Sequence, residues 1–212
     1  MSEALTILPV GDHGVLLELE SNATVHSVAA AVRDCFGDQL MEVVPGHTTL
    51  LLVYAAGDRI PDFSELAAVA TTTIGPPDDD ADGSAGAKVV SIPVRYDGED
   101  LAAVAQALGI DREGVIELHR APLYTVAFMG FAPGFPYLVG LPDELELSRL
   151  ELPRVQVPAG SVAVAAGYCG IYPGSAPGGW NLLGRTEVTL FDPSSDPPAL
   201  LAPGDHVRFE PV

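Results

Sequence analysis

The chain has 212 residues and a formal net charge of −19 at pH 7, with 29 acidic and only 10 basic side chains. This balance excludes nucleic-acid binding, because contact with phosphates requires clustered lysine and arginine. Apolar residues make up 48% and charged residues 18%, which is typical of a globular chain. No apolar run approaches the ~20 residues that cross a bilayer. Met1–Glu3 lack the basic start of a signal peptide, so we expect a cytoplasmic protein without a membrane partner.

The first part of the chain predicts an α+β domain over residues 1–76. Short apolar runs predict strands, and apolar residues at helical spacing predict two helices. In chain order, the expected elements are strands Thr6–Val10 and Val15–Glu20, helix Thr24–Phe36, strands Glu42–Val44 and Thr48–Tyr54, and a helix from Asp62 or Ser64 to Thr72. Two helices against a small antiparallel sheet form an α+β sandwich. Residues 77–87 are rich in Asp, Pro and Gly, which indicates an exposed linker.

Residues 88–212 predict a mainly-β domain. We expect a strand at Val89–Tyr96, helices Asp100–Leu108 and Asp111–Arg120, and strands Tyr124–Gly130, Val155–Pro158, Ser161–Ala165, Gly170–Tyr172, Glu187–Phe191 and His206–Phe209. Many short strands joined by Gly/Pro turns indicate a closed or nearly closed barrel.

The only lysine of the chain is Lys88, and no glycine-rich turn precedes it. A P-loop and Ser–Lys catalysis both depend on a placed lysine, so we expect neither a self-sufficient P-loop ATPase nor a Ser–Lys amidase. The two cysteines, Cys35 and Cys169, and five scattered histidines have no metal-ligand spacing. We therefore predict no metal site, and we interpret both cysteines as packing residues.

Phe128–Tyr137 holds four aromatic side chains, two glycines and two prolines in ten residues. Proline removes ladder donors and glycine weakens strands, so we expect this segment to leave the sheet and form a rigid loop. Glycine also lets a ligand approach the backbone. The alternative interpretation is a barrel corner stiffened by proline, with the rings packed in the core.

A second such cluster, Tyr172–Asn181, contains the only tryptophan, which prefers a loop edge or an interface. If the two loops face each other, they form an aromatic groove that suits a small cyclic substrate or an extended peptide. The candidate groove residues are Phe128, Gly130, Phe131, Pro133, Gly134, Phe135, Tyr137, Tyr172, Pro173, Trp180 and Asn181.

Three residues are candidates for catalysis: Arg154, Arg185 and His119. The arginine fork can clamp a carboxylate or phosphate; the alternative for each arginine is a salt bridge at the surface or barrel end. His119 ends a helix beside Glu117 and offers an acid–base pair, or it interacts with the helix dipole.

These stretches together resemble the family of the B-type subunit of 5-oxoprolinase, also called allophanate hydrolase subunit 1, which includes the histidine-kinase inhibitor KipI. The matching blocks are Gly130–Leu138, Pro153-Arg154, Val157–Val162, Gly170–Pro173, Gly178–Trp180, Leu183–Thr186, Leu190–Pro193 and Leu201–Asp205. The resemblance implies an N-terminal ferredoxin-like α+β domain and a C-terminal cyclophilin-like β-barrel.

The resemblance also implies an ATP-dependent hydrolase that opens 5-oxo-L-proline to L-glutamate, with Mg²⁺ expected alongside ATP. The implied partners are the C-type subunit of 5-oxoprolinase, which is also called allophanate hydrolase subunit 2, and a third component, the A-type subunit. Two departures from the family pattern, Tyr168-Cys169 and Asn181, replace residues that are commonly Gln-Thr and Gln, which leaves the substrate open. The alternative function is a KipI-like regulatory module that binds and inhibits a sensor histidine kinase.

Overall fold

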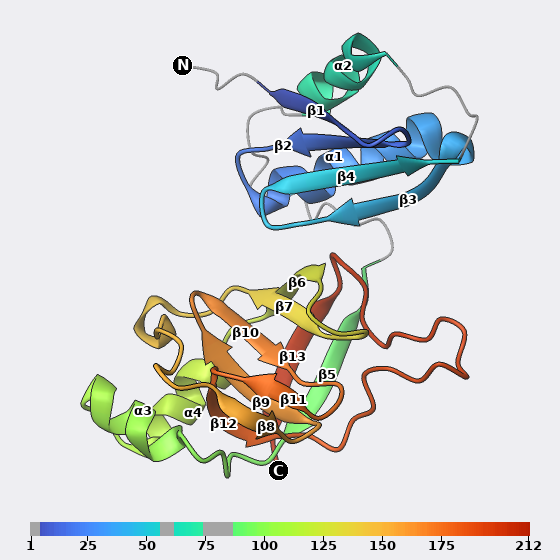
Figure 1. The fold of residues 1–212 in the computed structure, drawn as a ribbon. Coiled ribbons are helices and arrows are strands. Elements are labelled where there is room, and N and C mark those ends of the chain that lie inside the picture. The colour runs from blue at the N-terminus through green and yellow to red at the C-terminus, as the bar shows by residue number, and fades with distance from the viewer. Residues whose placement is uncertain (1–4, 56–61, 74–86) are drawn as a thin grey trace. The chain divides into compact units, whose positions relative to one another are not determined.

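The computed structural model describes residues 5–55, 62–73 and 87–212 (Figure 1). The chain divides into two compact units, Met1–Gly86 and Ala87–Val212. Each unit has a hydrophobic core of its own. The predicted linker, residues 77–87, lies outside the described residues except for Ala87.

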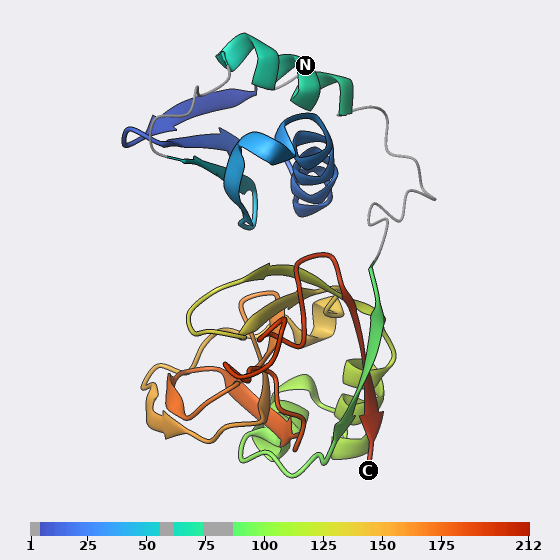
Figure 2. The same cartoon turned by 90° about the vertical axis from the view of Figure 1, so that its right-hand side faces the viewer.

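The first unit is a four-stranded antiparallel sheet with two helices. Its elements are β1 (Thr6–Val10), β2 (Gly14–Glu18), α1 (Asn22–Phe36), the 3-10 turn η1 (Gly37–Gln39), β3 (Leu40–Pro45), β4 (Thr49–Tyr54) and α2 (Phe63–Thr73). The strand order is β1-β2-β4-β3. Helix α1 lies across one face of the sheet and α2 packs beside α1 (Figure 2). Leu50, Leu52 and Tyr54 alternate along β4 and point into this core.

Side chains fix the start of both helices of the first unit. The Ser21 hydroxyl accepts a hydrogen bond from the Thr24 backbone N–H at 3.2 Å. At α2, the Asp62 backbone N–H donates to the Glu65 carboxylate at 2.9 Å, while the Asp62 carboxylate accepts from the Ser64 N–H at 3.4 Å. Of the two expected starts, Asp62 and Ser64, the structure has Asp62 as the cap, with Glu65 completing it from within the helix.

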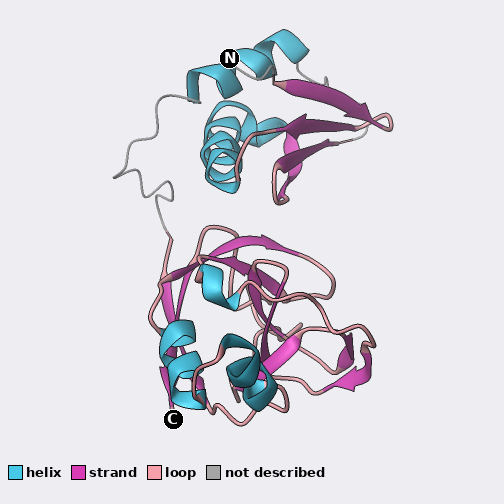
Figure 3. Cartoon of the chain, turned by 90° about the vertical axis from the view of Figure 1, so that its left-hand side faces the viewer, coloured by secondary structure: helices cyan, strands magenta, loops and turns pink. Residues whose placement is uncertain are grey.

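The second unit is built on a seven-stranded sheet (Figure 3). Its elements are β5 (Val89–Val94), α3 (Leu101–Leu108), α4 (Arg112–Arg120), β6 (Tyr124–Met129), β7 (Pro136–Val139), η2 (Asp143–Leu145), β8 (Arg154–Val157), β9 (Ser161–Ala165), β10 (Tyr168–Ile171), β11 (Ala176–Gly178), β12 (Asn181–Arg185) and β13 (His206–Pro211). The strand order is β12-β9-β10-β7-β6-β13-β5, and β11 pairs with β8 in a separate two-stranded sheet.

The two outer strands of the large sheet, β5 and β12, are joined by the chain that follows β5. Arg95 and Arg185 exchange two backbone hydrogen bonds of 2.9 Å, and the Gly98 N–H donates to the Leu183 carbonyl at 3.1 Å. A Cβ at Gly98 would collide with the backbone of Leu182 and Leu183, so this close approach requires glycine. The contact of residues 95–100 with Leu182–Arg185, called the seam below, makes the sheet a nearly closed barrel, as predicted.

The structure corrects two local predictions. Glu187–Phe191 is not a strand, because Val188 N–H turns back to the Thr186 hydroxyl and only Phe191 forms an isolated bridge, with Ala199. The segment is instead a loop, and its apolar residue Leu190 is buried. Phe128–Tyr137 does not leave the sheet as a whole: Phe128 pairs with Tyr137 in the β6–β7 ladder, and only residues 130–135 form the connecting loop.

Candidate functional site

The aromatic side chains of the β6–β7 hairpin form one end of a continuous ring cluster. Phe128 and Tyr137 are cross-strand partners, and their rings stack at 4.4 Å with an interplanar angle of 16°. The connecting loop returns Phe135 onto Tyr137, with 5.1 Å between ring centroids. The hairpin therefore presents its rings as a fixed set.

The two Gly/aromatic loops are in direct contact, as predicted. Phe135 meets Trp180 edge to face at 5.6 Å and Tyr172 at 5.2 Å, and Tyr137 meets Trp180 at 5.7 Å. Gly170 makes room for this contact, since a Cβ there would lie 2.9 Å from both the Phe135 Cζ and the Trp180 Cζ3 atoms.

Tyr168 also belongs to the cluster, and sequence reasoning placed neither it nor Gly170 there. The Tyr168 ring lies 5.5 Å from that of Tyr137 and 5.7 Å from that of Phe128. Gly170 belonged to a recognised block, but only the fold shows that its missing side chain accommodates two rings. We refer to Phe128, Phe131, Phe135, Tyr137, Tyr168, Tyr172 and Trp180 as the aromatic cluster.

The aromatic cluster combines both interpretations of these loops. Phe135 and Tyr172 are 2% exposed and Trp180 is 5% exposed, so these rings are core. Phe131 is 60% exposed while its ring contacts Phe135 at 5.3 Å. Its φ of 64° is in the left-handed region, which costs a side-chain-bearing residue about 1–3 kcal/mol. Phe131 is therefore the most exposed ring of the cluster, while Phe128, Tyr137 and Tyr168 are half-buried.

The remaining predicted groove residues shape this surface in different ways. Gly134 has a φ of 79°, and a Cβ there would lie 2.6 Å from that of Phe191, so only glycine fits. Pro133 is exposed, whereas Gly130 and Pro173 are half-buried. Asn181 is 8% exposed, and its side-chain amide donates to the Ser148 carbonyl at 3.0 Å and the Val164 carbonyl at 3.2 Å. Asn181 therefore holds the barrel wall.

Arg154 lies at the edge of the aromatic cluster and is engaged in a structural clamp. One terminal nitrogen, Nη2, donates to both Asp100 carboxylate oxygens, at 2.7 and 2.8 Å. Its Nε donates to Glu99 at 3.2 Å and its Nη1 to the Trp180 carbonyl at 3.4 Å. Asp100 also accepts from the Leu182 N–H at 2.7 Å, so the clamp ties β8 to the seam.

The structure separates Arg185 from the aromatic cluster. Arg185 ends β12, whereas Trp180 precedes its first residue, so the two are about 16 Å apart along an extended strand. The guanidinium of Arg185 pairs with Asp97, and so does that of Arg95. The predicted alternative, a salt bridge at the barrel end, describes this pairing.

His119 lies in the barrel core instead of at a groove. Its side chain is 0% exposed; Nδ1 lies 2.8 Å from the Tyr96 hydroxyl and Nε2 lies 3.2 Å from the Cys169 sulfur. Burial lowers the pKa of His119 to about 3 and raises that of the Cys169 thiol, so both are neutral near pH 7. A neutral, enclosed imidazole neither reaches a substrate nor supplies charge to the helix dipole.

The other chemically reactive side chains are also engaged. The Ser161 hydroxyl donates to the Pro158 carbonyl at 2.8 Å. The Lys88 ammonium donates to the Leu200 carbonyl at 2.6 Å and lies 3.7 Å from Asp205. Among residues 5–55, 62–73 and 87–212, no three His, Cys, Asp or Glu side chains gather as metal ligands. No helix among the described residues is long and apolar enough to span a membrane.

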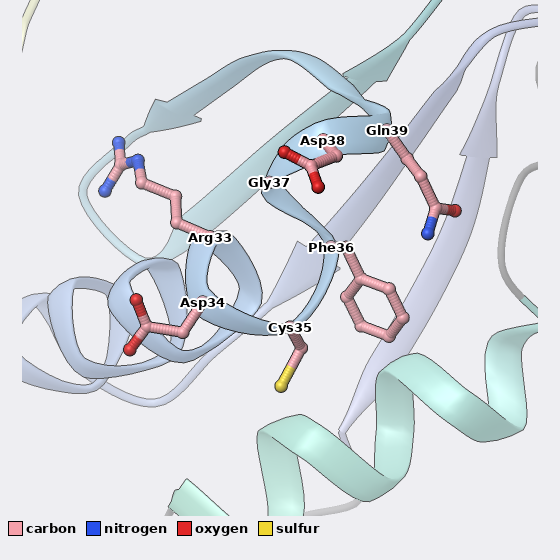
Figure 4. Close-up of a pocket in the computed structure, with 7 residues that line it drawn as sticks. All are labelled: Arg33, Asp34, Cys35, Phe36, Gly37, Asp38 and Gln39. Carbon is pink, nitrogen blue, oxygen red and sulfur yellow. The ribbon is translucent and has the colours of Figure 1, made fainter.

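A small hollow in the first unit is a poor candidate for a site. It measures about 140 Å³ and is lined by the consecutive residues 33–39 at the end of α1. The side chains fan out from this turn instead of converging on one point (Figure 4). Arg33 turns to the Val43 carbonyl, 3.2 Å away. The second unit therefore holds the candidate site.

Comparison with known proteins places the chain in a family. The family model of the carboxyltransferase domain, subdomain C and D, matches residues 5–201. The chain therefore belongs to this carboxyltransferase family. Within it, the chain is similar to the B-type subunit of 5-oxoprolinase from Escherichia coli O157:H7, with 39% identity over 209 residues that cover 95% of this chain and 94% of that protein. The B-type subunit of 5-oxoprolinase from Bacillus subtilis (strain 168) is 33% identical, covering 99% and 93%. The resemblance seen in the motif blocks is confirmed.

Solved structures agree with this assignment. The crystal structure of TTHA0988 superposes with a TM-score of 0.77 at 39% identity, covering 94% of this chain. The match spans only 40% of the longer TTHA0988 chain. The Kluyveromyces lactis urea carboxylase is 21% identical with a TM-score of 0.67, covering 98% of this chain and 22% of that one, and shares the fold.

Proposed function

We propose that this chain is a subunit of an ATP-dependent 5-oxoprolinase, which opens the ring of 5-oxo-L-proline to give L-glutamate. The observation that carries the proposal is the similarity to the B-type subunit of 5-oxoprolinase over 94% of the Escherichia coli protein. In this reaction, ATP transfers its terminal phosphoryl group to the lactam oxygen, and water then attacks the activated carbon. The C–N bond breaks to leave the acyl phosphate of glutamate, and a second water hydrolyses this acyl phosphate, so that glutamate, ADP and phosphate leave and one ATP and two waters are consumed.

The topology supports the finer assignment of both units. The first unit runs β-β-α-β-β-α with strand order β1-β2-β4-β3. Moving its first strand to the end converts this into the β-α-β-β-α-β order of a ferredoxin-like fold. We assign the seven-stranded, nearly closed barrel of the second unit to the cyclophilin-like class that the family resemblance implies.

We assign the ligand-facing surface to Phe131 and the rings beneath it. An exposed phenyl ring offers a stacking face to a small cyclic amide, and the half-buried Tyr137 extends that face. Arg154, held by Asp100, is a positioning residue in this proposal, because its guanidinium fixes the Trp180 backbone behind the surface.

ATP chemistry is assigned to the complex and not to this chain alone. The described residues do not fit an ATP–Mg²⁺ site: the only lysine is engaged by Leu200 and Asp205, and no three His, Cys, Asp or Glu side chains among them gather as metal ligands. A homologue of the C-type subunit, together with an A-type homologue as the third component, completes the proposed enzyme. The chain contributes a rigid, partly apolar surface from which water is displaced around the ring of the substrate.

The test is reconstitution with the C-type and A-type homologues, following ADP and glutamate release with 5-oxo-L-proline. We expect no turnover when this chain is omitted, and a loss of tenfold or more, about 1.4 kcal/mol, with Phe131→Ala. The control is Leu152→Ala, which removes another exposed apolar side chain (85% exposed). Full turnover without this chain contradicts the proposal. Recovery of a sensor histidine kinase instead of the C-type homologue in a pull-down favours the KipI-like alternative.

A further inference from the structure

The seam of the barrel carries a hollow of its own, at the opposite end of β12 from the aromatic cluster. It has a volume of about 310 Å³ and is lined by Pro93, Arg95, Arg185, Thr186, Glu187 and Val212. This volume lies at the lower end of the range for small-molecule sites, which starts at roughly 300 Å³. Because about 16 Å of strand separates Arg185 from Trp180, one small molecule does not occupy both places.

Two arginines of this hollow converge on a single carboxylate oxygen. Asp97 Oδ2 accepts from Arg95 Nε at 2.8 Å and from Arg185 Nε and Nη2 at 3.0 and 2.8 Å. Burial alone would raise the pKa of Asp97, but the hydrogen bonds and charges of Arg185 and Arg95 outweigh it and hold that pKa below its usual value. Within the described structure Arg95 donates through Nε alone, which leaves both of its terminal nitrogens available to a ligand.

The fold does not need both guanidiniums. The backbones of Arg95 and Arg185 already close the seam through their reciprocal hydrogen bonds. Their side chains are 51% and 56% exposed, and exposed ion pairs contribute only about 0–1 kcal/mol to stability. One arginine is enough to neutralise the charge of Asp97, so that ion pair does not require the guanidinium of the second arginine. The paired backbones fix where both side chains start, which reduces the entropy lost when an anion binds.

The charges around the hollow define the ligand that fits. The two guanidiniums pair with Asp97, and Glu187 lines the same hollow without an ion pair to any described residue. A dianion such as phosphate is repelled by the two carboxylates. A monoanion that also has an N–H donor complements both the positive and the negative charges of the hollow. Its carboxylate pairs with the arginines, and its N–H donates to a carboxylate. Pro93 and Val212 add apolar surface for a short carbon skeleton.

We propose that the seam hollow binds a small carboxylate of net charge −1 that also has an N–H donor, either a lactam acid or an acidic amino acid, through Arg95, Arg185 and Glu187. These two ligands rest on the proposed function: 5-oxo-L-proline carries one carboxylate and a lactam N–H, and L-glutamate carries two carboxylates and an ammonium, with a net charge of −1. The hollow is then a second binding site for the substrate or product on this chain, in addition to the surface at Phe131.

Calorimetric titration of the full chain, without ATP or partner, tests this proposal with four probes. The probes are 5-oxo-L-proline, L-glutamate, 2-pyrrolidinone (which lacks the carboxylate) and inorganic phosphate. We expect saturable binding of one of the first two, and neither binding of nor competition by the last two. Arg95→Gln should weaken binding about tenfold or more. The matched control is Arg120→Gln, whose exposed guanidinium pairs with Glu117 on α4, and it should bind normally.

A second variant keeps the test independent of folding. Glu187→Gln breaks no ion pair of the described residues, and we expect it to weaken amino-acid binding and to let phosphate compete. No binding of either acid, equal binding by Arg95→Gln, or phosphate competition in the wild type overturns the proposal. Binding lost in Phe131→Ala but kept in Arg95→Gln moves the ligand to the aromatic cluster and also overturns it. The titration contains neither ATP nor a partner subunit, so a negative titration does not affect the result of the reconstitution. Likewise, a failed reconstitution does not affect the result of the titration.

Discussion

At its start, β12 follows Trp180, whose ring is enclosed by Phe135 and Tyr137; at its end it carries Arg185, whose guanidinium is more than half exposed. At the first end, the packing of neighbouring rings fixes the side chain of Trp180. The second is specified by backbone pairing, which leaves the side chains free to face solvent. Arg185 and Trp180 are close in sequence but belong to two different surfaces, because the length of β12 separates them.

The largest effect is expected where the aromatic packing is tightest. Gly170→Ala places a methyl group 2.9 Å from both Phe135 and Trp180, and overpacking a core costs typically 1–3 kcal/mol. We expect a loss of about 2 kcal/mol in the free energy of unfolding, measured by urea titration with Trp180 fluorescence. Gly174→Ala is the control, since nothing lies within 4 Å of its added carbon, and it should change stability by less than about 0.5 kcal/mol. Equal stability of the two variants contradicts the tight packing.

The core beneath the seam predicts a dependence of stability on pH. Tyr96, within the seam, bonds to His119, whose folded pKa is about 3 against an ordinary value of 6.5. Because the folded pKa is depressed, the unfolded chain binds the proton first as pH falls. The stabilisation is complete above pH 6.5 and is lost as pH falls towards 3.

At pH 5 the loss from this one group amounts to about 2 kcal/mol, at 1.36 kcal/mol per pH unit. Urea titrations between pH 7.5 and 5 measure it, and His119→Gln should flatten the slope. If the free energy of unfolding of His119→Gln depends on pH as steeply as that of the wild type, groups other than His119 cause the acid sensitivity.

The two candidate arginines should differ in their contribution to folding. Arg154 and Asp100 are only 21% and 14% exposed, and breaking a buried pair leaves an uncompensated charge. We expect Arg154→Ala to cost about 2 kcal/mol and Arg185→Ala less than about 1 kcal/mol, because exposed pairs contribute little. Thermal unfolding of the two variants side by side measures the difference. If Arg185→Ala is the more destabilising, the seam depends on side chains and not on its backbone.

Local pattern predicted much of this fold. The bounds of β1 and β9 are those expected, and the α1, α3 and α4 helices agree to within a residue or two, because apolar periodicity and caps such as Asp111 are local signals. β7, β11 and β12 were missed because their Gly and Pro residues hide the strand pattern.

The site was harder to predict, since it depends on contacts between distant segments. The contact between Phe135 and Trp180 could be predicted from the composition of the two loops, because aromatic side chains in such loops pack against each other. The burial of His119 and the partners of Arg154 did not, because Cys169 and Asp100 lie about fifty residues away in the chain. Sequence distance gave no hint that Asp97 and Asp100 would occupy the two arginines.

The smallest effect on stability, with the opposite sign, is expected at Phe131. Its φ of 64° suits glycine, so Phe131→Gly relieves strain while it removes an exposed ring that contributes little burial. Glycine also gives the unfolded chain more freedom, which offsets part of that relief. We expect the free energy of unfolding to rise by at most about 1 kcal/mol, measured by urea titration, while turnover in the reconstituted complex falls. Phe131→Ala keeps the strain without the ring and separates the two effects: both variants should lose turnover, but only the glycine variant should be stabilised. A strained backbone that is retained only to display a ring is a functional feature, and unchanged turnover in both variants would assign Phe131 to packing alone.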